Sequence, residues 1–98
     1  MNNHEIAALK RLLVIAHSDT GQSRRVSDFL LSWWNSATCG AFDPTDLWAL
    51  DQQIINDVLL MIQVISTHHS YPDSLGFRSE FEHLVKQWRP HLVCEDTK

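Results

Sequence analysis

A short apolar run that stops abruptly at turn residues constrains this chain more than any other feature. Residues 12–16 (LLVIA) are all apolar, and residues 17–21 (HSDTG) are typical of a turn. An apolar run bounded in this way is typical of a strand buried on both faces of a parallel sheet. A helix is the alternative, because apolar side chains also recur at three- and four-residue spacing at Ile6, Leu9, Leu12, Leu13 and Ala16. The abrupt stop favours a strand, preceded by a short lead-in helix within residues 1–10.

The residues after this turn follow the pattern of a helix. Apolar side chains recur on one side of it, at Val26, Phe29, Leu30, Trp33 and Ala37. Gly40 permits a break after this helix. Residues 38–42 are a weakly indicated second strand, and residues 43–46 indicate a turn or the start of a short helix.

A second apolar run spans residues 57–65 and ends in the polar segment 66–74 (STHHSYPDS). This loop, in which Pro72 pushes Tyr71 towards extended geometry, favours a second buried strand. A central helix is the alternative, because a run that is apolar all round fits both periodicities. Pro90 then ends a predicted helix whose apolar stripe is Phe77, Phe81, Leu84, Val85 and Trp88. Residues 91–98 form an edge strand or a tail.

The predicted order of elements is strand, helix, weak strand, short helix, strand, helix. This alternation predicts an α/β fold with a parallel sheet. Residues 1–98 make a single domain with room for about three βα units. An all-α bundle is the remaining alternative, and it requires both apolar runs to be helices.

The turn after the first apolar run is rich in hydroxyl groups. At a strand-to-helix turn, free backbone N–H groups and the positive end of the helix dipole favour an anion. Ser18, Thr20 and Ser23 add hydroxyl donors, and Gly21 permits close backbone approach. The turn therefore predicts a site that holds a phosphomonoester without transferring it, since no lysine is placed to reach a terminal phosphate. The alternative is that Ser18 or Asp19 only caps the helix.

Two stretches resemble the flavodoxin-like family. Residues 18–28 (SDTGQSRRVSD) are similar to the phosphate-binding loop and first helix of flavodoxin-like domains, especially those of sulfite and cytochrome reductases. Residues 57–60 (DVLL), followed by Ser66-Thr67 and Pro72-Asp73, resemble the third strand of that family and the loop beyond it. The resemblance covers residues 11–90. It implies a shortened, doubly wound parallel sheet that binds FMN outside the carboxyl ends of its first and third strands.

The resemblance also implies which residues hold the flavin. The FMN phosphate would lie against the first loop, at Ser18, Thr20, Gly21, Gln22 and Ser23. The isoalloxazine ring would lie beside the second loop, at Ser66, Thr67, His68 and Tyr71. This second loop departs from the family pattern because it contains no glycine, and Tyr71 or a histidine would stack on the ring instead.

The function implied by the resemblance is that of a small FMN-binding electron-transfer protein with a redox protein as its partner. In such a protein the flavin supplies the redox chemistry and the chain supplies binding and electrostatics, so we expect an electron carrier or a non-catalytic domain. Two alternatives stay open. One is a flavodoxin-like domain that has lost flavin and acts as a protein-interaction module, and the other is an all-α bundle of unknown function.

Composition and charge weigh against several other classes. The net charge is −4, with +2 on residues 1–25 (4 − 2) and −6 on the rest of the chain (4 − 10), so nucleic-acid binding is not expected. The longest apolar run falls short of the roughly 20 residues that span a bilayer. No histidine or cysteine spacing matches a metal site. Two isolated cysteines, Cys39 and Cys94, and a first segment unlike a secretory signal indicate a cytoplasmic protein.

A second face of the first long helix is a candidate interface. If Trp33 faces the sheet with Phe29 and Leu30, Trp34 and Leu31 lie about 100° round the helix. The face that carries Trp34 and Leu31 either packs into the core or forms an interface with another molecule, and the sequence leaves both alternatives open. A shortened sheet would also leave an open strand edge, and self-association would cover it.

Overall fold

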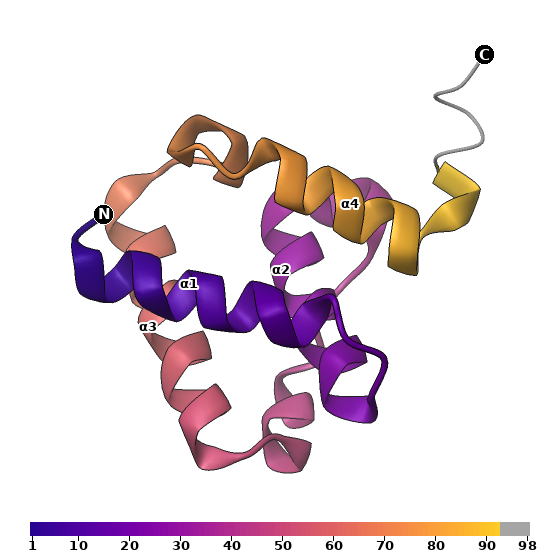
Figure 1. Ribbon diagram of the computed structural model, residues 1–98, viewed down its shortest axis with the longest axis horizontal. Coiled ribbons are helices and arrows are strands. Elements are labelled where there is room, and N and C mark those ends of the chain that lie inside the picture. The colour runs from indigo at the N-terminus through magenta and orange to yellow at the C-terminus, as the bar shows by residue number, and fades with distance from the viewer. Residues whose placement is uncertain (93–98) are drawn as a thin grey trace.

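This computed structural model describes residues 1–92, in which helices are the only regular secondary structure. Four α-helices are joined by connections that include two short 3₁₀-helices (Figure 1). In chain order the elements are α1 (Asn3–Ala16), α2 (Gly21–Cys39), the 3₁₀-helix η1 (Pro44–Ala49), α3 (Gln52–His68), the 3₁₀-helix η2 (Pro72–Leu75) and α4 (Arg78–Trp88). This described part contains no strand. The predicted α/β fold, a flavodoxin-like doubly wound parallel sheet, is therefore wrong, and the all-α alternative is confirmed.

The first apolar run, predicted as a strand, is the C-terminal part of α1. A capping box starts this helix: the Asn2 side chain accepts a hydrogen bond from the Glu5 N–H at 2.8 Å, and the Glu5 carboxylate accepts one from the Asn2 N–H at 2.9 Å. The buried residues begin upstream of the run and keep helical spacing at Ala8, Leu9, Leu12, Leu13 and Ala16. The predicted lead-in helix and the predicted strand are thus one continuous helix.

The second apolar run, also predicted as a strand, lies inside α3. Its buried side chains occupy one helical face, made by Ile54, Asp57, Val58, Met61 and Val64. The helix ends at His68, and the next residue, His69, has a left-handed backbone with a φ of 50°. Tyr71 is extended before Pro72, as predicted. A polar loop ends a helix as readily as a strand, so its presence does not favour the strand.

The other predicted elements had mixed outcomes. Helices α2 and α4 form where one-sided apolar patterns predicted them, and α4 ends before Pro90. The weak second strand over 38–42 is absent, since 38–39 belong to α2 and 40–42 are irregular. Of the edge strand or tail predicted over 91–98, residues 91–92 are helical and 93–98 lie outside the described residues.

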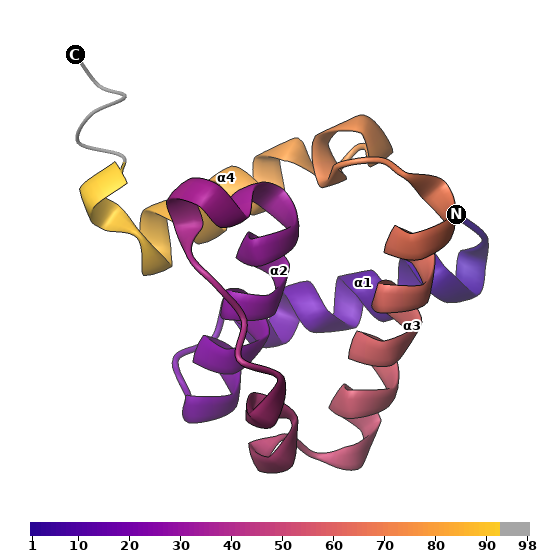
Figure 2. The same cartoon turned by 180° about the vertical axis from the view of Figure 1, so that it is seen from behind.

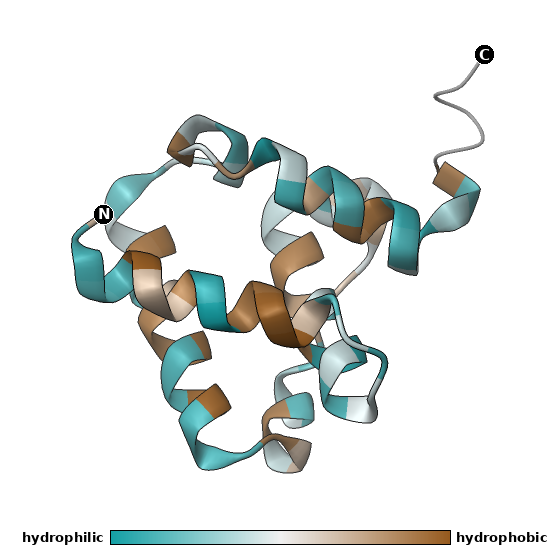
Figure 3. Ribbon diagram, viewed as in Figure 1, coloured by the Kyte–Doolittle hydropathy of each residue, from teal (hydrophilic) through white to brown (hydrophobic). Residues whose placement is uncertain are grey.

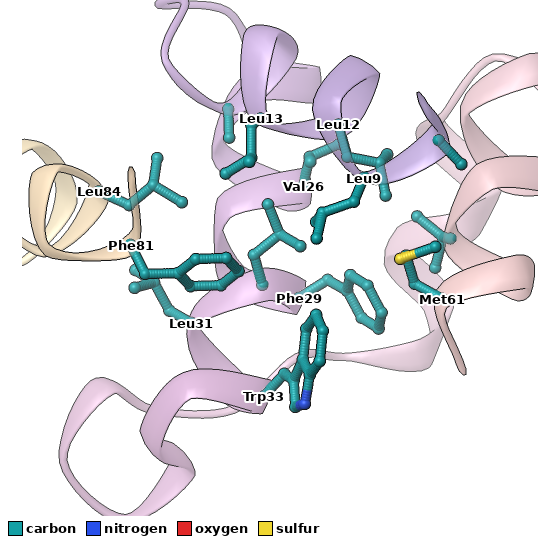
Figure 4. Close-up of a cluster of buried hydrophobic side chains, with 14 of the residues drawn as sticks. Leu9, Leu12, Leu13, Val26, Phe29, Leu31, Trp33, Met61, Phe81 and Leu84 are labelled. Atoms are coloured by element: carbon teal, nitrogen blue, oxygen red, sulfur yellow. The ribbon is translucent and has the colours of Figure 1, made fainter. Parts of the chain in front are cut away.

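Helix α1 lies at the centre of the arrangement. It packs against both α2 and α3, while α4 packs against α2 (Figures 1 and 2). Leu12 of α1, Phe29 of α2 and Met61 of α3 are gathered in one buried cluster (Figure 4). Phe81 of α4 extends this cluster beside Leu31 of α2 (Figure 4). The apolar stripe of α1 therefore joins the other helices into a single core.

Polar contacts fasten the end of α4 to the rest of the chain. The Trp88 indole donates to the carbonyl of Ala16 at 2.9 Å. The Arg89 guanidinium donates to the carbonyl of Cys39 at 2.7 Å and forms an ion pair with Asp28 at 2.8 Å. These bonds satisfy carbonyls at the C-terminal ends of both α1 and α2, where a helix leaves its last acceptors unpaired.

The central position of α1 predicts a clear difference between two substitutions on that helix. Leu12→Ala is expected to lower the free energy of unfolding by about 2–5 kcal/mol, because Leu12 is completely buried. Val14→Ala, on the solvent side of the same helix, is expected to change it by less than about 0.5 kcal/mol. Urea denaturation followed by circular dichroism measures both. Similar losses for the two variants would contradict the assigned helical register.

Candidate functional site

The hydroxyl-rich turn predicted to bind a phosphate joins two helices and caps the second one. The Thr20 hydroxyl accepts a hydrogen bond from the Ser23 N–H at 3.0 Å, and the Ser23 hydroxyl lies 2.8 Å from it. The Ser18 hydroxyl donates to the Val14 carbonyl at 3.1 Å. Gln22 accepts a hydrogen bond from the Asp51 N–H at 2.8 Å. Each of these polar side chains is thus engaged within the chain.

The electrostatics of this turn also differ from those expected. The positive end of the α2 dipole, beginning at Gly21, is met here by the negative end of α1, whereas a strand would bring little dipole of its own. Gln87 donates a further hydrogen bond to the Ser18 carbonyl at 3.0 Å. The FMN phosphate site was inferred for a strand-to-helix turn in a flavodoxin-like sheet, and that physical basis is absent.

The second predicted loop lies far from the first. The hydroxyls of Ser66 and Thr67 donate to the carbonyl of Gln63, and His68 is the last residue of α3. In both views this end of α3 lies near the start of α1, whereas the turn at Thr20 follows the end of α1 (Figures 1 and 2). A helix of 14 residues is about 21 Å long. The structure does not bring the two predicted halves of the flavin site together.

A break inside α2 creates a different site. Asn35 leaves the helical conformation, with φ −165° and ψ 89°, and its side chain accepts a hydrogen bond from the Thr38 N–H at 3.3 Å. Asparagine is a favoured cap because its side chain replaces the missing backbone acceptor. The chain therefore restarts a short helical segment at Asn35, and the residues just before it, Trp33 and Trp34, stand at the edge of the break.

The loop between α3 and η2 lies against this break. The Trp33 indole donates a hydrogen bond to the carbonyl of Ser70 at 3.1 Å, which fixes the loop to α2. Tyr71 follows, held extended by Pro72, and its side chain is 64% exposed. A large aromatic side chain so exposed and so firmly placed is a candidate binding residue.

Two adjoining hollows lie between the break and the loop. One has a volume of about 460 Å³ and the other of about 290 Å³, and both are bordered by Trp33 and Tyr71. We call them together the aromatic groove. The larger hollow is lined by Ser32, Trp33, Trp34, Asn35, Ser36, Ala37, Tyr71 and Asp73. The smaller one is lined by Trp33, Ile65, His69, Ser70 and Tyr71.

The walls of the aromatic groove are held in place by α4. The Trp34 ring stacks on Phe81, with ring centres 5.7 Å apart and planes 20° apart. The Trp33 ring meets the same phenylalanine edge to face at 5.9 Å. Since Phe81 is completely buried, both indoles are supported from behind and the groove is preformed.

One carboxylate lies in the groove without a cation. Asp73 accepts a hydrogen bond from the Ser74 N–H at 3.0 Å. Within residues 1–92 it forms no ion pair, as is true of several other exposed carboxylates of this part, so its negative charge is available to a ligand. Asp73 thus keeps unpaired negative charge beside exposed aromatic surface.

Two residues of the groove were predicted from the sequence in other roles. Tyr71 and Trp34 were predicted in separate roles, as a flavin-stacking residue and an interface residue, and the structure brings them together in the aromatic groove. Leu31, the other interface candidate, is completely buried in the core. Asn35 and Asp73 were missed as site residues. The sequence did contain a sign of the helix break: Asn35 and Ser36, two residues that favour helix caps, lie inside a predicted helix.

A further hollow of about 360 Å³ lies between α1 and α3. Two of its charged groups satisfy each other, since Arg11 binds Asp57 through two hydrogen bonds of 2.9 Å each, and the third, Asp51, accepts a hydrogen bond from Gln22 at 3.3 Å. The hydrogen bonds to Asp57 raise the pKa of the Arg11 guanidinium. Because this hollow has no aromatic side chain in its lining, whereas the groove has three, the aromatic groove is the better candidate site.

The fold and the groove together define a small all-α protein with a preformed aromatic binding surface. The chain belongs to the family of unknown function DUF7673, which it matches over residues 6–89. This assignment replaces the flavodoxin-like one. No curated protein and no solved structure matches the chain significantly.

Two general properties of residues 1–92 complete the description. None of their helices combines the length and apolar character needed to cross a membrane. No three histidine, cysteine, aspartate or glutamate side chains of this part are grouped so as to hold a metal ion.

The capping role of the turn predicts a stability effect. Thr20→Ala removes the acceptor for the Ser23 N–H and is expected to lower the free energy of unfolding by about 1 kcal/mol. Ser18→Ala, at an exposed hydroxyl outside the cap, is expected to change it by less than about 0.5 kcal/mol. Thermal and urea denaturation measure both. Equal stability of the Thr20→Ala variant and the parent chain would contradict the cap.

Proposed function

We propose that this protein is a non-catalytic interaction domain that binds a short basic segment of a partner protein in the aromatic groove. The observation that carries the proposal is Tyr71, a large aromatic side chain held in solvent beside Trp34 and the unpaired carboxylate of Asp73. Exposed aromatic residues on a supported surface are typical of binding hot spots.

The chemistry of the groove favours a cationic side chain. The faces of tryptophan and tyrosine rings attract lysine and arginine, and a nearby carboxylate adds a direct electrostatic attraction. Asp73 and the ring of Tyr71 line the same hollow, so one cation can meet both. Its volume of about 460 Å³ is within the range of ligand sites.

The polar rim of the groove favours a peptide as the carrier of that cation. Asn35, Ser32 and Ser36 line the larger hollow with amide and hydroxyl groups. Such groups both donate and accept hydrogen bonds, as the backbone of an extended peptide requires. The redox partner expected earlier belonged to the flavodoxin-like interpretation, and the partner proposed here is defined by its positive charge instead.

The charge of the whole chain supports the same choice. With a net charge of −4 the chain attracts a basic segment from a distance and repels an acidic one. The arginines of α2 do not oppose this, since Arg24 pairs with Asp28 and Arg25 with Asp46. We place this interaction in the cytoplasm, as the two isolated cysteines of the sequence indicate.

Panning of a random peptide library on the purified protein tests the proposal. We expect the enriched peptides to contain arginine or lysine, and labelled versions to bind by fluorescence anisotropy. Tyr71→Ala is expected to weaken their binding about tenfold or more, since it removes about 1.4 kcal/mol or more of contact energy. Asp73→Asn is expected to weaken binding and to reduce its dependence on salt.

Trp48→Ala is the matched control, because Trp48 is an 86% exposed aromatic residue on η1, outside the groove. It is expected to leave binding unchanged. Enrichment of acidic or uncharged peptides, or an equal loss in the Trp48→Ala and Tyr71→Ala variants, would contradict the proposed function.

A further inference from the structure

Helix α3 differs from the other three α-helices in its lack of charge. Between Gln52 and His68 it contains no lysine, arginine or glutamate, and its single aspartate, Asp57, is buried against Arg11. Each other α-helix carries both acidic and basic residues. The exposed polar residues of α3 are instead Gln52, Gln53, Asn56, Gln63, Ser66, Thr67 and His68. Loss of charged residues is typical of the centre of a protein–protein interface.

The same helix exposes apolar side chains. Leu59 is 50% exposed and Ile62 is 43% exposed, and Ile55 is half-buried one turn before Leu59. These three residues are spaced four and three apart, so they form one stripe along the helix. We call them the α3 stripe. The ribbon of α3 carries both hydrophobic and hydrophilic residues along its length (Figure 3).

Part of the apolar surface of α3 is therefore left exposed to solvent. The apolar arc of an amphipathic helix is ordinarily covered across its whole width. Within the described chain α3 packs chiefly on α1, and its stripe lies outside the face made by Ile54, Val58 and Met61. Burying the stripe against another surface removes apolar area from water at no cost in charge desolvation.

We propose that the α3 stripe is a self-association surface, on which the α3 helix of a second copy packs antiparallel across a two-fold axis. Two-fold pairing places each residue against a different residue of the partner except near the axis, where it meets its own copy. With the axis near Leu59, the two copies of Leu59 meet at the centre. Ile55 of one copy then meets Ile62 of the other.

Charge favours a second copy over an unlike partner on this surface. Two chains of net charge −4 repel one another, and a charge-free face lets them meet where that repulsion is least. Glutamine and asparagine side chains carry both donors and acceptors, so amides such as Asn56 and Gln63 pair with identical groups. A basic or an acidic partner would find no complementary charge on α3.

The contact is small. A helix of 17 residues is about 25 Å long, and one helical face supplies only part of the roughly 800 Å² that each partner buries in a standard interface. We therefore infer a weak dimer that forms as the protein concentration rises. This inference is independent of peptide binding, because Leu59 and Ile62 do not line the aromatic groove.

Sedimentation equilibrium of the full chain, from micromolar to millimolar concentration, tests the inference. We expect the average mass to rise from that of a monomer towards that of a dimer. Leu59→Glu is expected to raise the dissociation constant by at least about tenfold, because it places a carboxylate of each copy at the two-fold axis. Val14→Glu, which adds the same charge at a 70% exposed position of α1, is expected to leave it unchanged.

Disulfide trapping tests the antiparallel arrangement separately. In a chain carrying Cys94→Ser, Leu59→Cys is expected to form a covalent dimer under mild oxidation much faster than Val14→Cys, since only the former brings two thiols together at the axis. A monomeric parent chain at millimolar concentration would overturn the inference. Equal dissociation by the two glutamate variants, or equal trapping of the two cysteine variants, would also overturn it.

Discussion

The burial of one face of α1 is the interaction on which the rest of the structure depends. Leu9 and Leu12 are completely buried where α1 packs on α2 and α3. Burial of side chains of this size contributes about 1.5–3 kcal/mol each, which is large beside the 5–15 kcal/mol that stabilises a typical domain. Because α1 covers one side of α2 and α3, the aromatic groove and the α3 stripe are left on surfaces that α1 does not cover. Both proposed binding surfaces follow from this packing.

The fold was predictable where the apolar residues fitted only the helical period. It was not predictable where they fitted both the helical and the strand period. α2 and α4 carry one-sided stripes and formed as predicted. Residues 12–16 fit a strand and a helix equally well, and the deciding signal was the continuation of helical spacing upstream to Ala8 and Leu9. The same five residues read alone contain no such signal. In α3, Leu59 and Ile62 are apolar although they lie outside the buried face. Their presence gave the sequence an uninterrupted apolar run, which is also the pattern of a buried strand.

The site was less predictable than the fold, because it depends on contacts between distant segments. The pattern that resembled a phosphate loop, Thr20 followed by Ser23, is also the pattern of a helix cap, and capping needs only neighbouring residues. Tyr71 and Trp34 were recognised as unusual, yet nothing in their spacing places them in one groove. That placement depends on the break at Asn35 and on the bond from Trp33 to Ser70, which join α2 to a loop 37 residues away.

The binding of a basic segment in the aromatic groove is tested most directly by the four tryptophan indole N–H signals of an NMR spectrum. Trp33 and Trp34 line the groove, whereas Trp48 lies on η1. The Trp88 indole donates a hydrogen bond to the carbonyl of Ala16, at the C-terminal end of α1. On titration with a basic peptide, we expect the signals of Trp33 and Trp34 to shift and saturate while those of Trp48 and Trp88 stay in place. Shifts confined to Trp48 or Trp88 would contradict binding in the groove.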